Sequence, residues 1–203
     1  MGFRGYARQV RDPARPHRRR VRALRQCVGL YRPIGFHGTL SFLRSRCGPL
    51  ETDEAALLRA IAVLEESRDL WLADLRAYAG ERAGAKRRGR RSPASPAPGA
   101  SAHWYGLRQE AAPHGVLFWH RRLWQRRRRR PTFIAAPAEA VNVLRACAEA
   151  VLSTGGHLPP DLRGSLAASI VLLRADPEER GRADFGAGEL LALAREIEAA
   201  SSP

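Results

Sequence analysis

Aromatic and arginine side chains are concentrated in one stretch of this 203-residue chain, from His103 to Arg130. Three of the four tryptophans lie within it, and it ends in a block of five consecutive arginines. A guanidinium group forms paired hydrogen bonds with phosphate, and an aromatic ring stacks on an unpaired base of any type. The stretch therefore predicts a helical protein without enzymatic activity that binds nucleic acid, with RNA or single-stranded DNA favoured.

The predicted contacts with nucleic acid are of two kinds. Basic side chains are expected to bind phosphates; they are Lys86, Arg87, Arg88, Arg90, Arg91, Arg121, Arg122, Arg126, Arg127, Arg128, Arg129 and Arg130. Aromatic side chains are expected to stack on exposed bases; they are Trp104, Tyr105 and Trp124. The arginine-rich N-terminal segment is expected to add a further basic surface. Binding of this kind depends strongly on salt and weakly on base sequence.

Part of the aromatic stretch also has the pattern of a buried helix face. Val116, Trp119 and Leu123 recur at helical spacing, which predicts that Trp119 and Leu123 pack inside the protein. Pro113 is expected in the first turn of that helix. The block of five arginines cannot point inward, because burying unpaired charge is prohibitive. It must face water or an acidic ligand.

Charge alternates along the chain, which carries a net charge of +15. Residues 1–50 carry +11, residues 51–80 carry −4, residues 81–131 carry +12 and residues 132–203 carry −4. The acidic segments cannot neutralise the basic ones, so attraction to a polyanion is expected. Arginine outnumbers lysine 34 to one. That bias indicates a GC-rich coding sequence, which accounts for part of the arginine excess.

The remaining composition predicts neither a metal site nor a cofactor. Cys27, Cys47 and Cys147 do not have the spacing of a zinc site, and their odd number indicates a reducing compartment. No apolar run approaches 18 residues, so no transmembrane helix is expected. Trp119, Leu123 and Trp124 beside the arginine block also fit attachment to an anionic membrane surface, which is a further alternative.

These features predict an intracellular protein whose compartment depends on its source. In a bacterium the expected location is the cytoplasm. In a eukaryote, the first 50 residues have the arginine-rich, acid-poor composition of a mitochondrial transit peptide, and the cluster from Lys86 to Arg91 is typical of nuclear import. Ser92 and Ser95, each followed by proline, are candidate phosphorylation sites that would lower the positive charge.

Periodicity and breaking residues predict an all-α fold, a small helical bundle with a basic, partly disordered N-terminal arm and a Pro/Ser/Arg-rich linker. The expected segments are a basic arm with short helices at 1–50, a long amphipathic helix at 51–83, a flexible basic linker at 84–101, an aromatic and arginine-rich helix at 102–131, and a C-terminal helical segment at 132–203. Within them, helices are expected at 17–29 and 38–46, from Pro137 to Ser153, from Pro160, in a single turn after Asp176, and around Leu190 to Ile197.

The long helix carries a short heptad seam. Thr52 is its predicted N-cap, and the seam consists of Leu57, Ile61, Leu64, Arg68, Trp71, Leu75 and Tyr78. About three heptads favour packing within the chain over dimerisation. The alternative function is a protein-interaction subunit that uses residues 51–80 and 135–200, with the basic segments serving targeting or an acidic partner.

One catalytic pattern occurs in the sequence. An arginine followed four to six residues later by a histidine resembles the active-site motif of the HEPN ribonucleases, an all-α family that cleaves RNA. The matches are Arg11 to His17, Arg32 to His37 and Arg108 to His114. In a chain so rich in arginine, about two or three matches arise by chance. A ribonuclease is therefore the minor alternative.

Overall fold

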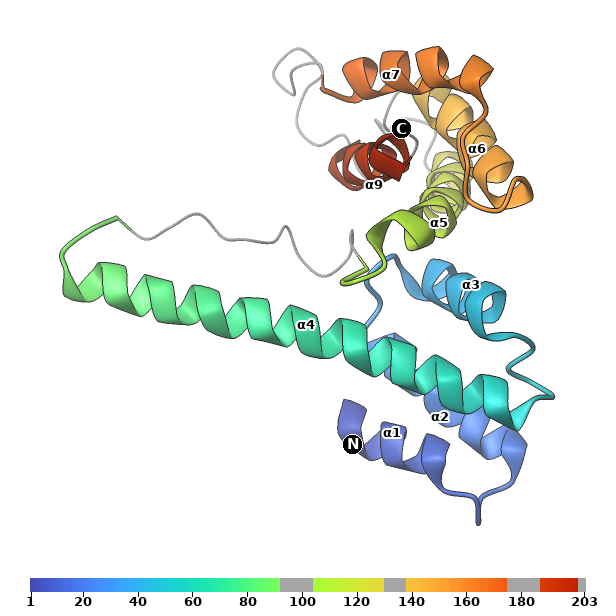
Figure 1. Ribbon diagram of the computed structural model, residues 1–203, viewed down its shortest axis with the longest axis vertical. Helices are drawn as coiled ribbons and strands as arrows, with labels where there is room; N and C mark the ends of the chain where they lie inside the picture. The colour runs from blue at the N-terminus through green and yellow to red at the C-terminus, as the bar shows by residue number, and fades with distance from the viewer. Residues whose placement is uncertain (92–103, 130–137, 175–186, 201–203) are drawn as a thin grey trace. The chain divides into compact units, whose positions relative to one another are not determined.

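The computed structural model describes residues 1–91, 104–129, 138–174 and 187–200, and these residues form helices joined by turns, without strands (Figure 1). The predicted all-α fold is confirmed. The chain divides into two compact units. The first comprises Met1–Pro33 and Leu43–Ser101, and the second comprises Ile34–Phe42 and Ala102–Pro203. The division falls inside helix α3 (Phe36–Cys47).

The first unit is built from α1 (Phe3–Arg11), α2 (His17–Leu30) and α4 (Glu54–Arg87). Helix α1 packs along α2, and both helices contact α4. Their buried side chains form one core, which includes Leu24, Leu57 and Ile61. The seam of α4 therefore packs within the chain along its first half, as predicted.

Residues 1–50 are a structural part of both units rather than an appended arm. Phe3, Ala7 and Val10 share one face of α1 and are buried. Their spacing of four and three residues is the signal that predicts this helix, although the basic composition of the segment hides it. The expected helix at 17–29 is confirmed by α2, and the expected one at 38–46 lies within α3.

The bounds of α4 differ from the predicted bounds at both ends. The N-cap is Asp53, whose carboxylate accepts a hydrogen bond of 2.8 Å from the backbone N–H of Ala55, so the prediction of Thr52 is wrong. The helix continues through Gly80 to Arg87, and Gly89 with a φ of +62° follows its end. The first four residues of the predicted linker are therefore helical. Residues 92–101 of that linker lie outside the described residues.

The second unit contains α5 (Arg108–Arg129), α6 (Ala138–Ser153), α7 (Pro160–Arg174) and α9 (Ala187–Ala200). Helix α5 packs on α6 and α9, and α7 packs on the same two helices. Trp119 and Leu123 are buried, as predicted. Pro113 lies in the second turn of α5 rather than the first, because the helix begins at Arg108. The single turn expected after Asp176 lies outside the described residues.

Glycines allow a close approach between the start of α3 and α5 in the second unit. Gly35 has a φ of +81°, and a methyl group there would overlap the Phe118 ring. A Cβ at Gly38 would lie 3.1 Å from the backbone oxygen of His114. Only glycine fits at these two positions without a shift of the neighbouring atoms. The two glycines therefore allow residues 34–42 to pack closely on α5.

Candidate nucleic-acid interface

The outward face of α5 carries a tryptophan between two arginines, one on each side. Arg121, Trp124, Gln125 and Arg128 are all exposed, and their spacing places them on one side of the helix. We call these four residues the tryptophan-arginine face. Trp124 is 49% exposed, whereas the other described tryptophans are buried or half-buried. Three of the predicted site residues, Arg121, Trp124 and Arg128, are thus brought together.

Other predicted arginines of this stretch lie elsewhere on the helix. The Arg122 guanidinium lies 5.0 Å from the centre of the Trp119 ring, in a cation-π contact at the edge of the core. Arg126 is half-buried and interacts with other groups of the protein. The side chains of Arg127 and Arg129, and the whole of Arg130, lie outside the described residues.

Trp104 and Tyr105 belong to the core of the second unit. Trp104 is 1% exposed and packs edge-on against Phe42, with 4.5 Å between ring centres. Tyr105 is also buried, and the Arg108 guanidinium lies over its ring. Because their faces are covered, these rings cannot stack on a base in this structure. Trp104 and Tyr105 are therefore not part of the candidate interface.

A second basic cluster follows the end of α4, in the first unit. Its predicted members are all exposed; they are Lys86, Arg87, Arg88, Arg90 and Arg91. Lys86 and Arg87 lie in the last turn of the helix, where positive charge also complements the helix dipole. The Arg88 guanidinium lies against Gly84, so this side chain folds back along the helix. These five residues offer positive charge for phosphate contacts, and none of them has an aromatic ring on which a base could stack.

A third basic surface lies on α2. The sequence predicted a basic surface in the N-terminal segment but not which of its arginines are exposed. Arg18, Arg19, Arg22 and Arg25 are exposed, and α2 contains no acidic residue. We call these four residues the α2 arginine face. Seven residues separate Arg18 from Arg25, which is two helical turns or about 10.5 Å along the axis. The signal was present in the sequence as arginines at three- and four-residue spacing opposite Ala23, Leu24, Cys27 and Val28.

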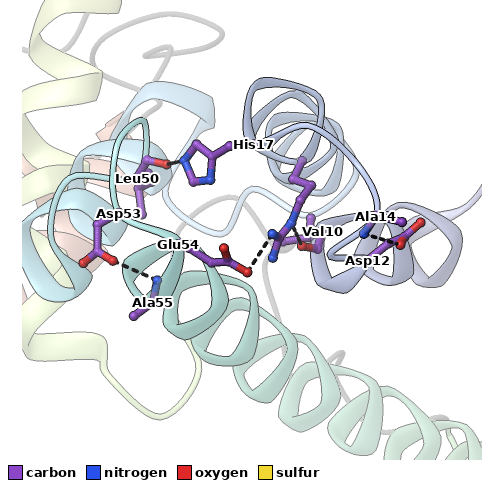
Figure 2. A network of polar contacts seen from close by, with 9 residues as sticks. Val10, Asp12, Ala14, His17, Leu50, Asp53, Glu54 and Ala55 are labelled. Atoms are coloured by element: carbon purple, nitrogen blue, oxygen red, sulfur yellow. Dashed lines mark hydrogen bonds and ion pairs between the residues drawn. The ribbon is translucent and has the colours of Figure 1, made fainter.

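Arg20, on the same helix, is buried and joins three helices through Val10 and Glu54, both of which are labelled in Figure 2. Its Nε donates a hydrogen bond of 2.7 Å to the backbone oxygen of Val10, near the end of α1. Its Nη1 donates one of 2.8 Å to Glu54, the first residue of α4. Arg20 is 3% exposed. This arginine therefore stabilises the first unit and is not available to a ligand.

In two of the three arginine-histidine pairs, the arginine and the histidine have separate partners. Arg108 contacts Tyr105 and lies 3.9 Å from Glu196, whereas His114 is buried and forms a hydrogen bond of 2.9 Å with Ser41. Burial lowers the pKa of His114 from 6.5 to about 4, so its imidazole is neutral. Arg11 pairs instead with Glu65, and His17 with the backbone oxygen of Leu50. The geometry gives the ribonuclease alternative no support.

Histidines and acidic residues do not gather into a metal site in the described parts of the chain. Among the helices that the structure describes, none combines the length and the apolar character needed to cross a membrane. No family model, curated protein or solved structure matches the chain.

Proposed function

We propose that this protein binds single-stranded nucleic acid and has no catalytic activity of its own. The observation that carries the proposal is the exposed Trp124 between Arg121 and Arg128 on the outward face of α5. The α2 arginine face and the basic cluster after α4 supply further phosphate contacts. A single strand fits this combination because its bases are free to stack.

The position of Trp124 favours a binding role over a packing role. The opposite side of α5 is already packed by Val116, Trp119 and Leu123. Trp124 therefore adds little to the core, and its exposed ring offers a stacking platform next to two guanidinium groups. Stacking of a base on an aromatic ring contributes about 1–3 kcal/mol per base.

The α2 arginine face supports the same proposal through electrostatics. Described acidic side chains neutralise other arginines of the first unit: Glu65 pairs with Arg11, and Asp12 pairs with Arg15. Arg18, Arg19 and Arg22 form no ion pair within the described part of the chain. Arg25 lies near Glu51, whose pKa is lowered mainly by its hydrogen bond with Arg44 and to a smaller extent by the charge of Arg25. A row of solvated guanidinium groups on a rigid helix is suited to successive phosphates of one strand.

The test is fluorescence anisotropy with labelled single-stranded RNA, single-stranded DNA and duplex DNA, repeated over a range of salt concentrations. Trp124→Ala should weaken binding to single strands about tenfold or more and affect duplex binding less, since paired bases do not stack on it. In a plot of the logarithm of the association constant against the logarithm of the salt concentration, the double variant R121A/R128A should reduce the magnitude of the slope by about 1.4. This change corresponds to the loss of two phosphate contacts with a single strand.

The matched control is R163A/R174A, which removes the same charge from exposed positions on α7 in the same unit. It should change affinity less than R121A/R128A. Equal losses for the two double variants would show that only net charge matters. Unchanged single-strand affinity in Trp124→Ala would remove the stacking part of the proposal.

A further inference from the structure

Three arginines of α1 line a hollow between this helix and α4, which we call the α1 hollow. They are Arg4, Arg8 and Arg11, and the other residues that line it are Ala7 and Glu65. The three arginines share one side of α1, because residues three and four apart are neighbours on a helix surface. The hollow has a volume of about 460 Å³, which lies in the usual range for sites that bind small molecules. Both helices belong to the first unit, so the hollow lies within one compact part of the chain.

Helix α1 is fixed in position by its buried side. Phe3, Ala7 and Val10 are buried. The Arg68 guanidinium of α4 lies 4.6 Å from the centre of the Phe3 ring, and Arg20 of α2 donates a hydrogen bond to the Val10 carbonyl. The backbone that carries the three arginines is therefore held in place without a ligand, and binding requires little reordering of it.

Two of the three arginines have no counterion within the described residues. Arg4 and Arg8 are exposed, and neither forms an ion pair or a side-chain hydrogen bond in that part of the chain. Arg11 donates a hydrogen bond of 2.9 Å from Nη1 to Glu65, and a second one from Nη2 to the other carboxylate oxygen. Among the described residues that line the hollow, Glu65 is the only acidic one. The α1 hollow therefore carries two uncompensated positive charges.

This charge indicates the class of ligand. A phosphate monoester carries a charge of about −1.5 to −2 at pH 7, whereas an internal phosphodiester or a carboxylate carries a single negative charge. Its three terminal oxygens accept hydrogen bonds from more than one guanidinium group. Arginines at this spacing repel each other, and a dianion between them relieves that repulsion. Charge and hydrogen bonding therefore both favour a phosphate monoester.

We propose that the α1 hollow binds a phosphate monoester, with Arg4 and Arg8 as its principal contacts. Arg11 and Glu65 border the bound group, and the Glu65 carboxylate limits the affinity because it lines the same hollow as the anion. A free nucleotide and the phosphorylated end of a nucleic-acid strand both carry this group. The site uses no residue of the tryptophan-arginine face or the α2 arginine face, so it is tested separately from the proposed function.

The first test is NMR titration of the full chain with adenosine monophosphate and with adenosine, at about 50 mM salt. The wild type should bind the monophosphate with a dissociation constant of about 1 mM or lower, and adenosine at least tenfold more weakly. R4Q/R8Q should weaken binding of the monophosphate at least tenfold, because both unpaired guanidinium groups are lost. The matched control R76Q/R82Q removes the same charge from exposed positions of α4 that begin about 16 Å beyond Glu65 along the axis. It should change the affinity less than about twofold.

A second pair of variants tests the sign of the electrostatic effect. Glu65→Gln removes the carboxylate from the hollow and frees Arg11, so it should strengthen binding of the monophosphate about threefold or more. The matched control is Glu66→Gln, which removes the same charge from the next position along α4. Glu66 is exposed and does not line the hollow, so this change should have a smaller effect. Circular dichroism verifies that every variant keeps the helical content of the wild type.

Fluorescence anisotropy identifies the source of the phosphate. Single-stranded RNA of one sequence is labelled at its 3′ end and carries either a phosphate or a hydroxyl at its 5′ end. Tighter binding of the phosphorylated strand, with the preference lost in R4Q/R8Q, assigns the hollow to strand ends. Equal binding of the two strands, with the monophosphate still bound, assigns it to free nucleotides. Because Trp124→Ala should weaken both strands alike, failure at the hollow is distinguishable from failure of the proposed function.

Three results would overturn the proposal. The first is a wild type with no preference for the phosphate, both between adenosine monophosphate and adenosine and between the two strands. The second is equal weakening by R4Q/R8Q and R76Q/R82Q, which would mean that only net charge matters. The third is a loss of affinity in Glu65→Gln as large as that in R4Q/R8Q.

Discussion

His114 should make the stability of the second unit depend on pH. The imidazole is 6% exposed, forms a hydrogen bond of 2.9 Å with Ser41 and packs edge-on against Phe42. Burial lowers its pKa from 6.5 to about 4, because a charged ring would lose its hydration. The unfolded chain, in which the pKa stays at 6.5, therefore binds a proton more readily than the folded chain.

The sign and size of the effect follow from this difference. The stabilisation is fully present above pH 6.5 and is lost as the pH falls through 6.5 toward 4. The free energy of unfolding should fall by about 2 kcal/mol between pH 7 and pH 5, and by about 3 kcal/mol once the folded state is also protonated.

The assay compares the wild type with His114→Gln, whose side chain is polar and does not titrate in this range. Urea unfolding, followed by the fluorescence of the buried Trp104 and Trp119, gives the free energy of unfolding at each pH. The difference between the two proteins should shrink by about 2 kcal/mol from pH 7 to pH 5. NMR titration of the His114 ring gives the pKa directly. A pKa near 6.5, or a difference that does not vary with pH, would refute the reasoning.

Two substitutions test the packing of each unit. Arg20→Met should lower the free energy of unfolding by about 1–2 kcal/mol, because the Val10 carbonyl and Glu54 lose their donor while the buried Nη2, which has no hydrogen-bond partner among the described residues, is removed. Gly35→Ala should cost about 2–4 kcal/mol, because its φ of +81° is strained for alanine and the added methyl group overlaps Phe118. Both changes are measured by urea unfolding.

Each of these substitutions has a matched control. Arg19→Met removes an exposed arginine next to Arg20 and should change stability by less than about 0.5 kcal/mol. Gly29→Ala adds a methyl group to α2 where nothing lies within 4 Å, and it should stabilise by about 0.5–1 kcal/mol. Arg20→Met as mild as Arg19→Met would mean that the clamp of Figure 2 contributes nothing measurable.

Helices with a continuous apolar stripe could be predicted from the sequence. The burial of Trp119 and Leu123 follows from spacing alone, and so do the first half of α4 and most of α2. Helix α1 was missed because arginines at three of its nine positions dominate its composition, while only Phe3, Ala7 and Val10 define its buried face. Its burial depends on contact with α2, which a local pattern does not encode.

The residues of the candidate interface were predicted from their types, and the structure shows which of these side chains point outward and which point into the core. Trp104 and Trp124 are equally plausible stacking residues by composition, yet one is in the core and the other is exposed. Arg19 and Arg20 are neighbours in one arginine run, yet only Arg20 is buried, since successive residues on a helix differ by about 100° in direction. Which of two similar side chains a core takes depends on partners far away in sequence.

The separation in sequence between α3 and its partners in the second unit matters during synthesis. Phe42 packs on Trp104 and His114, which leave the ribosome more than sixty residues after it. At the usual rate of about 5–20 residues per second, Phe42 waits roughly 3–15 s for these partners. During that interval its apolar neighbours are open to chaperones or to premature association. A fragment that begins at residue 102 would lack residues Ile34–Phe42, which belong to the second unit. The second unit is therefore completed only when two separate parts of the chain have been synthesised.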